Sequence, residues 1–129
     1  MRAWIEASEQ MLKTLGIRDS VGFRSPVGIQ TPELHHVLNE MRLPLVLWDQ
    51  RFYDTLFRFT PQRALRSLRH TQSGSIVLLH DAQRPSLKSE FLRTLPIYLA
   101  EAKSQGFRFH GLTRELCEEN FRFSGRDFR

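Results

Sequence analysis

The 129-residue sequence contains a single cysteine, Cys117, and no long run of apolar residues. One cysteine excludes an intrachain disulfide bond and a thiolate metal cluster, and we expect Cys117 to be a semi-buried small apolar residue. No segment approaches the roughly 20 apolar residues of a membrane-spanning helix, and the amino terminus lacks the apolar block of a signal peptide. These absences predict a soluble, cytoplasmic protein with no membrane partner.

Several motifs of enzymes are also missing. No serine sits in a nucleophile elbow, no glycine-rich loop is available to bind phosphate, and no H-E-x-x-H pair occurs. His35 and His36 are adjacent on a predicted helix, about 100° apart, so they cannot both bind one metal ion. Linkers and low-complexity tracts are absent as well, and the length fits one domain.

The charge is basic but dispersed. Nineteen Lys and Arg residues against fourteen Asp and Glu residues give a net charge of +5. Because these charges are spread along the chain, they predict a solvated surface rather than a polyanion site. The segments "FRFHG" (107–111) and "FRFSG" (121–125) interleave aromatic and basic residues as single-strand binders do, but a half-buried strand needs the same alternation. Nucleic acid is therefore not the expected partner.

Patterns typical of helices and of buried strands alternate along the chain. Thr31 and Thr60 each precede a proline, which is a signature of a helix start, and a further helix is expected from Thr94 to Ser104 with Pro96 in its first turn. Other helices are expected from about Met1 to Gly16 and at 112–119, a polar loop at 82–90, and buried strands at 21–24, 43–49, 75–79 and 106–112. This order predicts an α/β fold with a parallel sheet.

Polar side chains fall at the expected ends of these strands. They are Arg24, either Asp49 or Asp54, and His80 with Asp81. Because the carboxyl ends of parallel strands are where catalytic groups gather, these residues are the candidates for a functional site.

Three motifs in order resemble the third, fourth and fifth motifs of the NodB-type polysaccharide deacetylases. They are "FRSPVG" (23–28), "LVLWDQRFYDT" (45–55) and "GSIVLLHDA" (74–82), and "LPIYLAEAKSQGFRFHGL" (95–112) is similar to the final strand of that family. The resemblance implies part of a distorted (β/α) barrel, with about four parallel strands and flanking helices.

The resemblance covers residues 1–112, which correspond to the C-terminal half of such a domain. Residues 113–129 lie outside it, and we expect there a short helix and a basic aromatic tail. In this interpretation the segment from Phe121 to Phe128 packs across the opening of the half-barrel or adds a strand to it.

The resemblance implies a role for each candidate residue. The family removes the acetyl group from N-acetylated sugars, with a divalent metal, usually zinc, activating the attacking water. Arg24 matches the arginine that orients the catalytic base, and Asp54 matches the aspartate that positions a histidine. His80 matches that histidine, the general acid that protonates the departing amine. Leu78 matches an apolar residue that lines the pocket for the acetyl methyl group, and Trp48 helps to wall that pocket.

The sequence also departs from the family pattern. The first two family motifs, which supply the catalytic base and the metal ligands, have no counterpart here, so no cofactor is expected in this chain. Thr55 stands where many members carry tryptophan. We therefore expect a truncated deacetylase-like protein that is inactive alone. The alternative is a non-catalytic module that oligomerises or binds carbohydrate, and whether the chain is an enzyme stays open. Intact members are often extracytoplasmic.

A half-barrel also has consequences for assembly. Its open sheet would leave strand edges unpaired and an apolar face uncovered. We therefore expect a homo-oligomer, with an N-acetylated saccharide as the small-molecule ligand.

Overall fold

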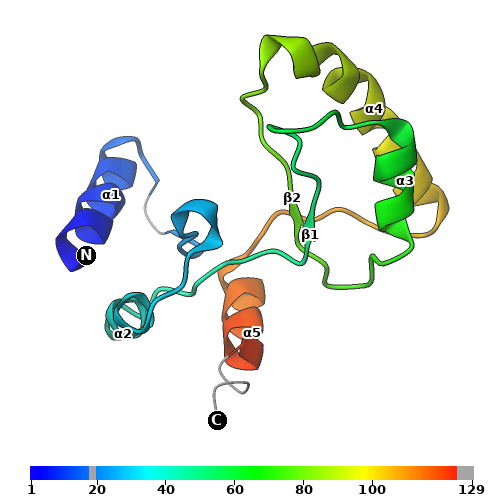
Figure 1. Cartoon of the computed structure of the whole chain (residues 1–129). Coiled ribbons are helices and arrows are strands. Elements are labelled where there is room, and N and C mark those ends of the chain that lie inside the picture. The colour runs from blue at the N-terminus through cyan, green and yellow to red at the C-terminus, as the bar shows by residue number, and fades with distance from the viewer. Residues whose placement is uncertain (18–19, 125–129) are drawn as a thin grey trace. The chain divides into compact units, whose positions relative to one another are not determined.

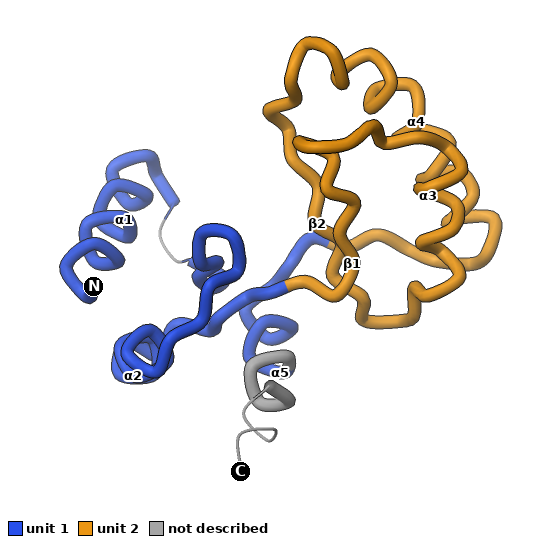
Figure 2. The backbone as a smooth tube through the Cα atoms, in the orientation of Figure 1, with its two compact units in different colours: residues 1–47, 111–129 blue, residues 48–110 orange. Residues whose placement is uncertain are grey.

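The computed structural model describes residues 1–17 and 20–124, and they form two compact units. Unit 1 contains Met1–Leu47 together with the residues from Gly111 onward, and unit 2 contains Trp48–His110 (Figure 2). Of the expected aromatic tail, residues 121–124 belong to the last helix, and residues 125–128 lie outside the described residues.

Unit 1 is built from helices and a pair of extended segments. Its elements are the helices α1 (Arg2–Thr14), α2 (Pro32–Glu40) and α5 (Arg114–Ser124) and the 3-10 turn η1 (Pro26–Gly28) (Figure 1). Phe23 and Leu45 form a parallel bridge between the segments that precede η1 and follow α2.

Helix α2 supplies half of the buried residues in the core cluster of unit 1. The Thr31 hydroxyl accepts a hydrogen bond from the Leu34 amide at 3.1 Å, which confirms the predicted N-terminal cap. Leu34, Val37 and Leu38 lie on one face of the helix and are buried, together with Ile5 of α1. Spacing along the sequence was therefore sufficient to place this helix and its inward face.

Unit 2 combines a short parallel ladder with two helices. Strand β1 (Gln50–Arg51) pairs with β2 (Val77–Leu78), and helices α3 (Pro61–Leu68) and α4 (Pro85–Ser104) pack against each other (Figure 1). The core is largely aromatic. The centre of the Phe52 ring lies 4.6 Å from that of Phe59 and 5.3 Å from that of Tyr98, in edge contacts. Edge contacts of this kind contribute beyond the buried area itself.

Helix α4 begins nine residues before the predicted start at Thr94. Pro85 occupies the first turn, so residues 85–90 of the polar loop expected at 82–90 are helical, whereas residues 82–84 are not. Thr94 is fully buried in the middle of α4 and its hydroxyl has no partner among the described residues, while Pro96 lies inside the helix. The prediction followed the threonine–proline signature, but burial of Leu87 and Phe91 outweighs the cost of an internal proline.

The predicted half-barrel with about four parallel strands is wrong. Within the described residues helices predominate, and the ladder consists of two strands of two residues each, besides the bridge at Phe23. The segment 106–112 forms no strand, and Phe107 instead packs against the aromatic core. An apolar pattern specifies burial, but a strand also needs a neighbour whose backbone groups pair with it. In the segment 106–112, Phe107 packs against side chains of the core, but no described segment pairs with the backbone.

None of the described helices combines the length and the apolar character that are needed to cross a membrane.

Candidate functional site

The turn after β1 separates the directions of three consecutive side chains. Phe52 and Asp54 are buried, whereas Tyr53 between them is 41% exposed. Tyr53 adopts a left-handed backbone conformation with φ of 52°, and its carbonyl accepts hydrogen bonds from the amides of Leu56 and Phe57, each at 2.9 Å. This tight turn delivers the Asp54 carboxylate into the interior of unit 2.

Asp54 holds His80 through two separate hydrogen bonds. The His80 amide donates to Oδ2 of Asp54 at 2.9 Å, and Nδ1 of the His80 ring lies 3.0 Å from Oδ1. Because an ionised carboxylate only accepts hydrogen bonds, Nδ1 carries the hydrogen. The His80 side chain is 44% exposed and that of Asp54 is 1% exposed. A buried carboxylate thus fixes an exposed imidazole, whose Nε2 remains for proton exchange with a bound molecule.

Gln83 completes the cluster. Its side-chain amide donates to Oδ2 of Asp54 at 2.7 Å and to the His80 carbonyl at 2.6 Å. The sequence analysis did not single out Gln83, because the stretch after His80 was expected to be a loop. The available signal was a side-chain amide three residues after the histidine, a spacing that lets it reach the His80 carbonyl.

The environment of Asp54 favours its ionised form. Burial raises the pKa of this carboxyl, but the hydrogen bonds from the His80 ring, the His80 amide and Gln83 together outweigh burial and hold the pKa below its ordinary value of 3.8. Asp54 therefore remains a negative acceptor for His80 at neutral pH.

Asp49, the other aspartate left open by the sequence, has a different position. Its carboxylate accepts hydrogen bonds from the Ser75 hydroxyl at 2.8 Å and from the Ile76 amide at 2.7 Å. The ladder begins at Gln50, so Asp49 lies at its amino end instead of the expected carboxyl end. Asp49 thus ties the two strands together where they enter the ladder.

Leu78 and Trp48 are both half-buried residues of unit 2. Leu78 is the last residue of β2, two positions before His80. Trp48 precedes β1 by two residues, so the parallel register places it at the amino end of the ladder, the opposite end from His80. Of the residues that the resemblance singles out in this unit, the structure joins Asp54 and His80 directly and places Leu78 on the strand that leads to His80.

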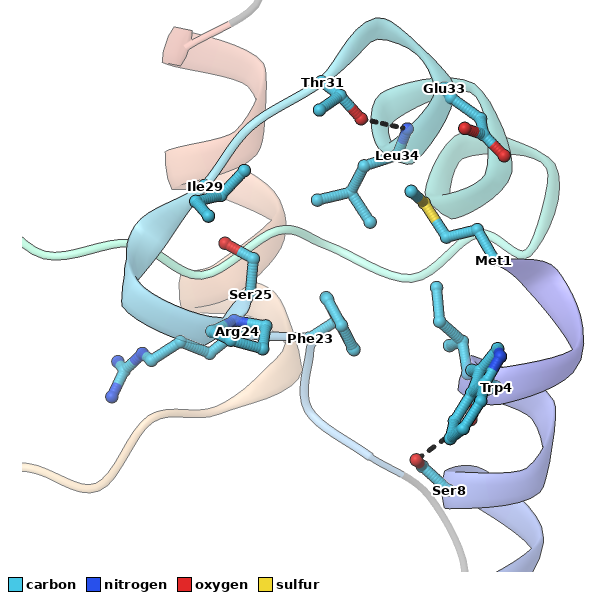
Figure 3. A pocket seen from close by; sticks show the side chains of 12 residues that line it. Met1, Trp4, Ser8, Phe23, Arg24, Ser25, Ile29, Thr31, Glu33 and Leu34 are labelled. Carbon is cyan, nitrogen blue, oxygen red and sulfur yellow. Dashed lines mark hydrogen bonds between the residues drawn. The ribbon is translucent and has the colours of Figure 1, made fainter.

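Arg24 belongs to unit 1. Its Nε donates a hydrogen bond to the Val46 carbonyl at 3.2 Å. It is also one of the residues around a hollow of about 670 Å³ that is lined mainly by apolar side chains of α1, η1 and α2. Figure 3 shows its guanidinium pointing away from Trp4 and Leu34, whereas neighbouring Phe23 faces them.

The side chains present do not fit a metal centre. Within residues 1–17 and 20–124, no three or more His, Cys, Asp or Glu side chains are grouped so that they could hold a metal ion. The zinc implied by the resemblance therefore has no set of protein ligands here. The chemistry of the site rests on the pair formed by Asp54 and His80.

Comparison of the chain with protein-family models and with curated proteins gave no match.

Proposed function

We propose that this chain carries the proton-donating part of a polysaccharide deacetylase-like hydrolase. The observation that supports the proposal is the contact between Asp54 and His80. The resemblance implies that His80 is the general acid and that Asp54 positions it. The two residues are 26 positions apart in the sequence and are joined by two hydrogen bonds. A chance contact between a histidine and an aspartate would not be expected to have this geometry.

In the proposed reaction, His80 protonates the amine that leaves when the acetamide of an N-acetylated sugar is hydrolysed. Asp54 keeps Nδ1 as a donor and stabilises the imidazolium, so that Nε2 is the nitrogen that releases the proton. Leu78 offers an apolar surface near the acid, which suits the acetyl methyl group. Trp48 takes no part in this reaction, because it lies at the opposite end of the ladder from His80. Arg24 takes none either, because the base that it would orient has no counterpart in this sequence.

The chain is not expected to hydrolyse the amide alone. The described side chains provide no ligand set for a metal, and no second acid–base group is in contact with His80 to activate water. Electrostatic stabilisation of the developing oxyanion is usually the largest part of such catalysis, so its absence removes most of the rate.

A second function, a non-catalytic carbohydrate-binding module, is favoured by a separate observation. Tyr53, Leu56 and Phe57 are 41%, 56% and 56% exposed in the turn that contains Asp54. Exposed apolar side chains that are grouped in a single turn are typical of interaction sites.

The test is binding of an N-acetylglucosamine trimer followed by NMR. We expect the trimer to shift the His80 ring and Leu78 methyl signals, whereas a glucose trimer of the same linkage, which lacks the acetamide, leaves them in place. Equal responses to both trimers, or none, would contradict the proposal. Acetate release by the chain alone that is lost in His80→Ala would contradict the expected inactivity.

A further inference from the structure

Two aromatic rings and two guanidinium groups contact one another around the turn that contains Asp54. The guanidinium of Arg51 lies 4.4 Å from the ring centre of Tyr53, and that of Arg63 lies 5.6 Å from the ring centre of Phe57. The rings of Tyr53 and Phe57 are 6.4 Å apart in an edge arrangement. We call these four residues the aromatic platform. Tyr53 and Phe57 belong to the turn that holds Asp54, the residue that fixes the proposed acid His80.

The two arginines of the aromatic platform are not equivalent. Arg63 donates hydrogen bonds to the carbonyls of Arg58 and Phe52, at 2.9 and 3.0 Å, so its guanidinium is used to hold the turn. Arg51 is exposed, and among the described residues no carboxylate lies within ion-pair distance of it. A guanidinium that lies over an aromatic ring can still bind a carboxylate through its N–H groups.

The backbone at Tyr53 carries strain that packing of its own side chain does not require. For a residue other than glycine, a backbone φ of 52° raises the free energy of the folded state by about 1 kcal/mol or more. The Tyr53 side chain is nevertheless 41% exposed. Asparagine would adopt the same conformation more readily. The tyrosine ring therefore stands at a position where asparagine would be less strained.

The charge of unit 2 matches an anionic ligand. Residues 48–110 contain ten Lys and Arg residues against five Asp and Glu residues, whereas the rest of the chain contains nine of each, so unit 2 carries the whole net charge of +5. Charge of one sign attracts polyanions over distances of about 10 Å at ordinary salt concentrations.

We propose that the aromatic platform binds a carboxylate-bearing sugar of an anionic, N-acetylated polysaccharide. The apolar face of the sugar ring packs against Tyr53 with the ring of Phe57 at its edge, and its carboxylate pairs with Arg51. This inference rests on the proposed function, because it names the substrate class of that site, and it adds an acidic sugar next to the one whose acetamide meets His80.

The experiment compares two hexasaccharides by titration calorimetry. One alternates glucuronate with N-acetylglucosamine, and the other is neutral and contains N-acetylglucosamine alone. We expect the wild type to bind the anionic hexasaccharide about tenfold more tightly, as a charge-assisted bidentate pair implies, and Arg51→Gln to remove this preference. Arg66→Gln, an exposed arginine on α3, removes the same charge from unit 2 and should retain the preference.

Tyr53→Asn separates binding from folding. It should weaken binding of both hexasaccharides while thermal stability stays the same or rises, because asparagine relieves the strained conformation. Equal affinity of the wild type for both hexasaccharides, or no binding of either, would overturn the inference. Tighter binding of a single-stranded oligonucleotide, lost in Tyr53→Asn, would overturn it in favour of nucleic acid. If a hexasaccharide shifts the His80 NMR signals but binds Arg51→Gln and Tyr53→Asn as tightly as the wild type, the inference is overturned and the proposed function stands.

Discussion

At the scale of single residues, Asp54 links the fold to the proposed chemistry. The same carboxylate that orients His80 also ties the end of β2 to the turn after β1, through the His80 amide and through Gln83. Its removal should therefore be visible in stability as well as in the response of His80 to a bound acetamide sugar.

Asp54→Asn should destabilise the protein by about 1–3 kcal/mol at neutral pH, because a buried charge-assisted network loses its acceptor. A carboxyl whose pKa is lower in the folded state stabilises the fold above its unfolded pKa, and this contribution is lost as the pH falls through the folded pKa. The difference between wild type and variant should therefore be full at about pH 6 and should shrink below about pH 4. Urea denaturation across this range measures it.

Asp81→Asn is the matched control, since Asp81 is the exposed carboxylate next to His80 in the sequence. It should leave stability within about 0.5 kcal/mol of the wild type at each pH. A stability difference for Asp54→Asn that stays constant from neutral to acidic pH would contradict the lowered pKa.

Gly22 occupies a position in unit 1 where no side chain fits. A Cβ atom there would lie 2.5 Å from Cγ2 of Val46 and 2.9 Å from the Pro44 carbonyl oxygen. Gly22→Ala should therefore destabilise the protein by about 1–3 kcal/mol, whereas Gly111→Ala, where nothing lies within 4 Å, should not. A thermal melt compares the two variants, and equal melting temperatures would contradict the close approach.

Cys117 reports on the same region. It is buried, and burial raises the pKa of its thiol against the opposing effect of Arg114 and Arg24. Both properties suppress the thiolate, so Cys117 should react slowly with an aromatic disulfide reagent. Reaction should be faster in Gly22→Ala, since the clash loosens the segment packed beside Cys117.

At the scale of secondary structure elements, local signals located the amino ends of α2 and α3 but not that of α4. Thr31 and Thr60 accept hydrogen bonds from the amides three residues later, as their sequence context predicted. Thr94 precedes a proline by two residues instead of one, and it is buried within α4. The capping signal is local, whereas the burial of α4 against α3 is decided by residues distant in the sequence.

Thr94→Val should raise stability by about 1 kcal/mol. Thr94 is fully buried and its hydroxyl has no partner among the described residues, so a methyl group of similar size removes a desolvated polar atom. Thr71→Val is the opposite case, because the Thr71 hydroxyl donates to the Ser67 carbonyl at 3.1 Å, and it should lower stability. Guanidinium denaturation measures both, and a loss of stability in Thr94→Val would show that the hydroxyl has a partner.

At the scale of the whole molecule, the expectation of self-association loses its original basis. The four-stranded open sheet that motivated it is not formed by the described residues, so no apolar sheet face requires covering. Helix α1 offers a different reason. Of the apolar face expected on this helix, Ile5 is buried, whereas Trp4, Met11 and Leu15 are 81%, 62% and 71% exposed.

We expect the chain to form dimers or larger assemblies through α1. Light scattering at micromolar concentrations should give a mass above that of one chain, and Trp4→Ser combined with Met11→Ser should lower it. Leu92→Ser, at an apolar position of α4 that is 56% exposed, serves as the control and should not change the mass. A wild type that remains monomeric would contradict the prediction.

The sequence by itself determined the helices with strong local signals and the residues of the proposed acid. Caps and the i, i+3, i+4 spacing act within a few residues, so α2, α3 and their buried faces follow directly from the chain. The sequence also placed His80 just beyond a buried apolar segment and offered Asp54 as one of two candidate partners.

Only the tertiary structure decided which aspartate meets His80 and how many strands form. The ladder begins at Gln50, which sends Asp49 to its amino end and leaves Asp54 to bind His80 and Gln83. Likewise, the apolar segment at 106–112 carries the pattern of a strand but pairs with no other segment of the described chain, and Phe107 is partly buried against the aromatic core instead. Periodicity specifies which side chains leave water, whereas strand pairing and register depend on backbone groups brought together from distant parts of the chain.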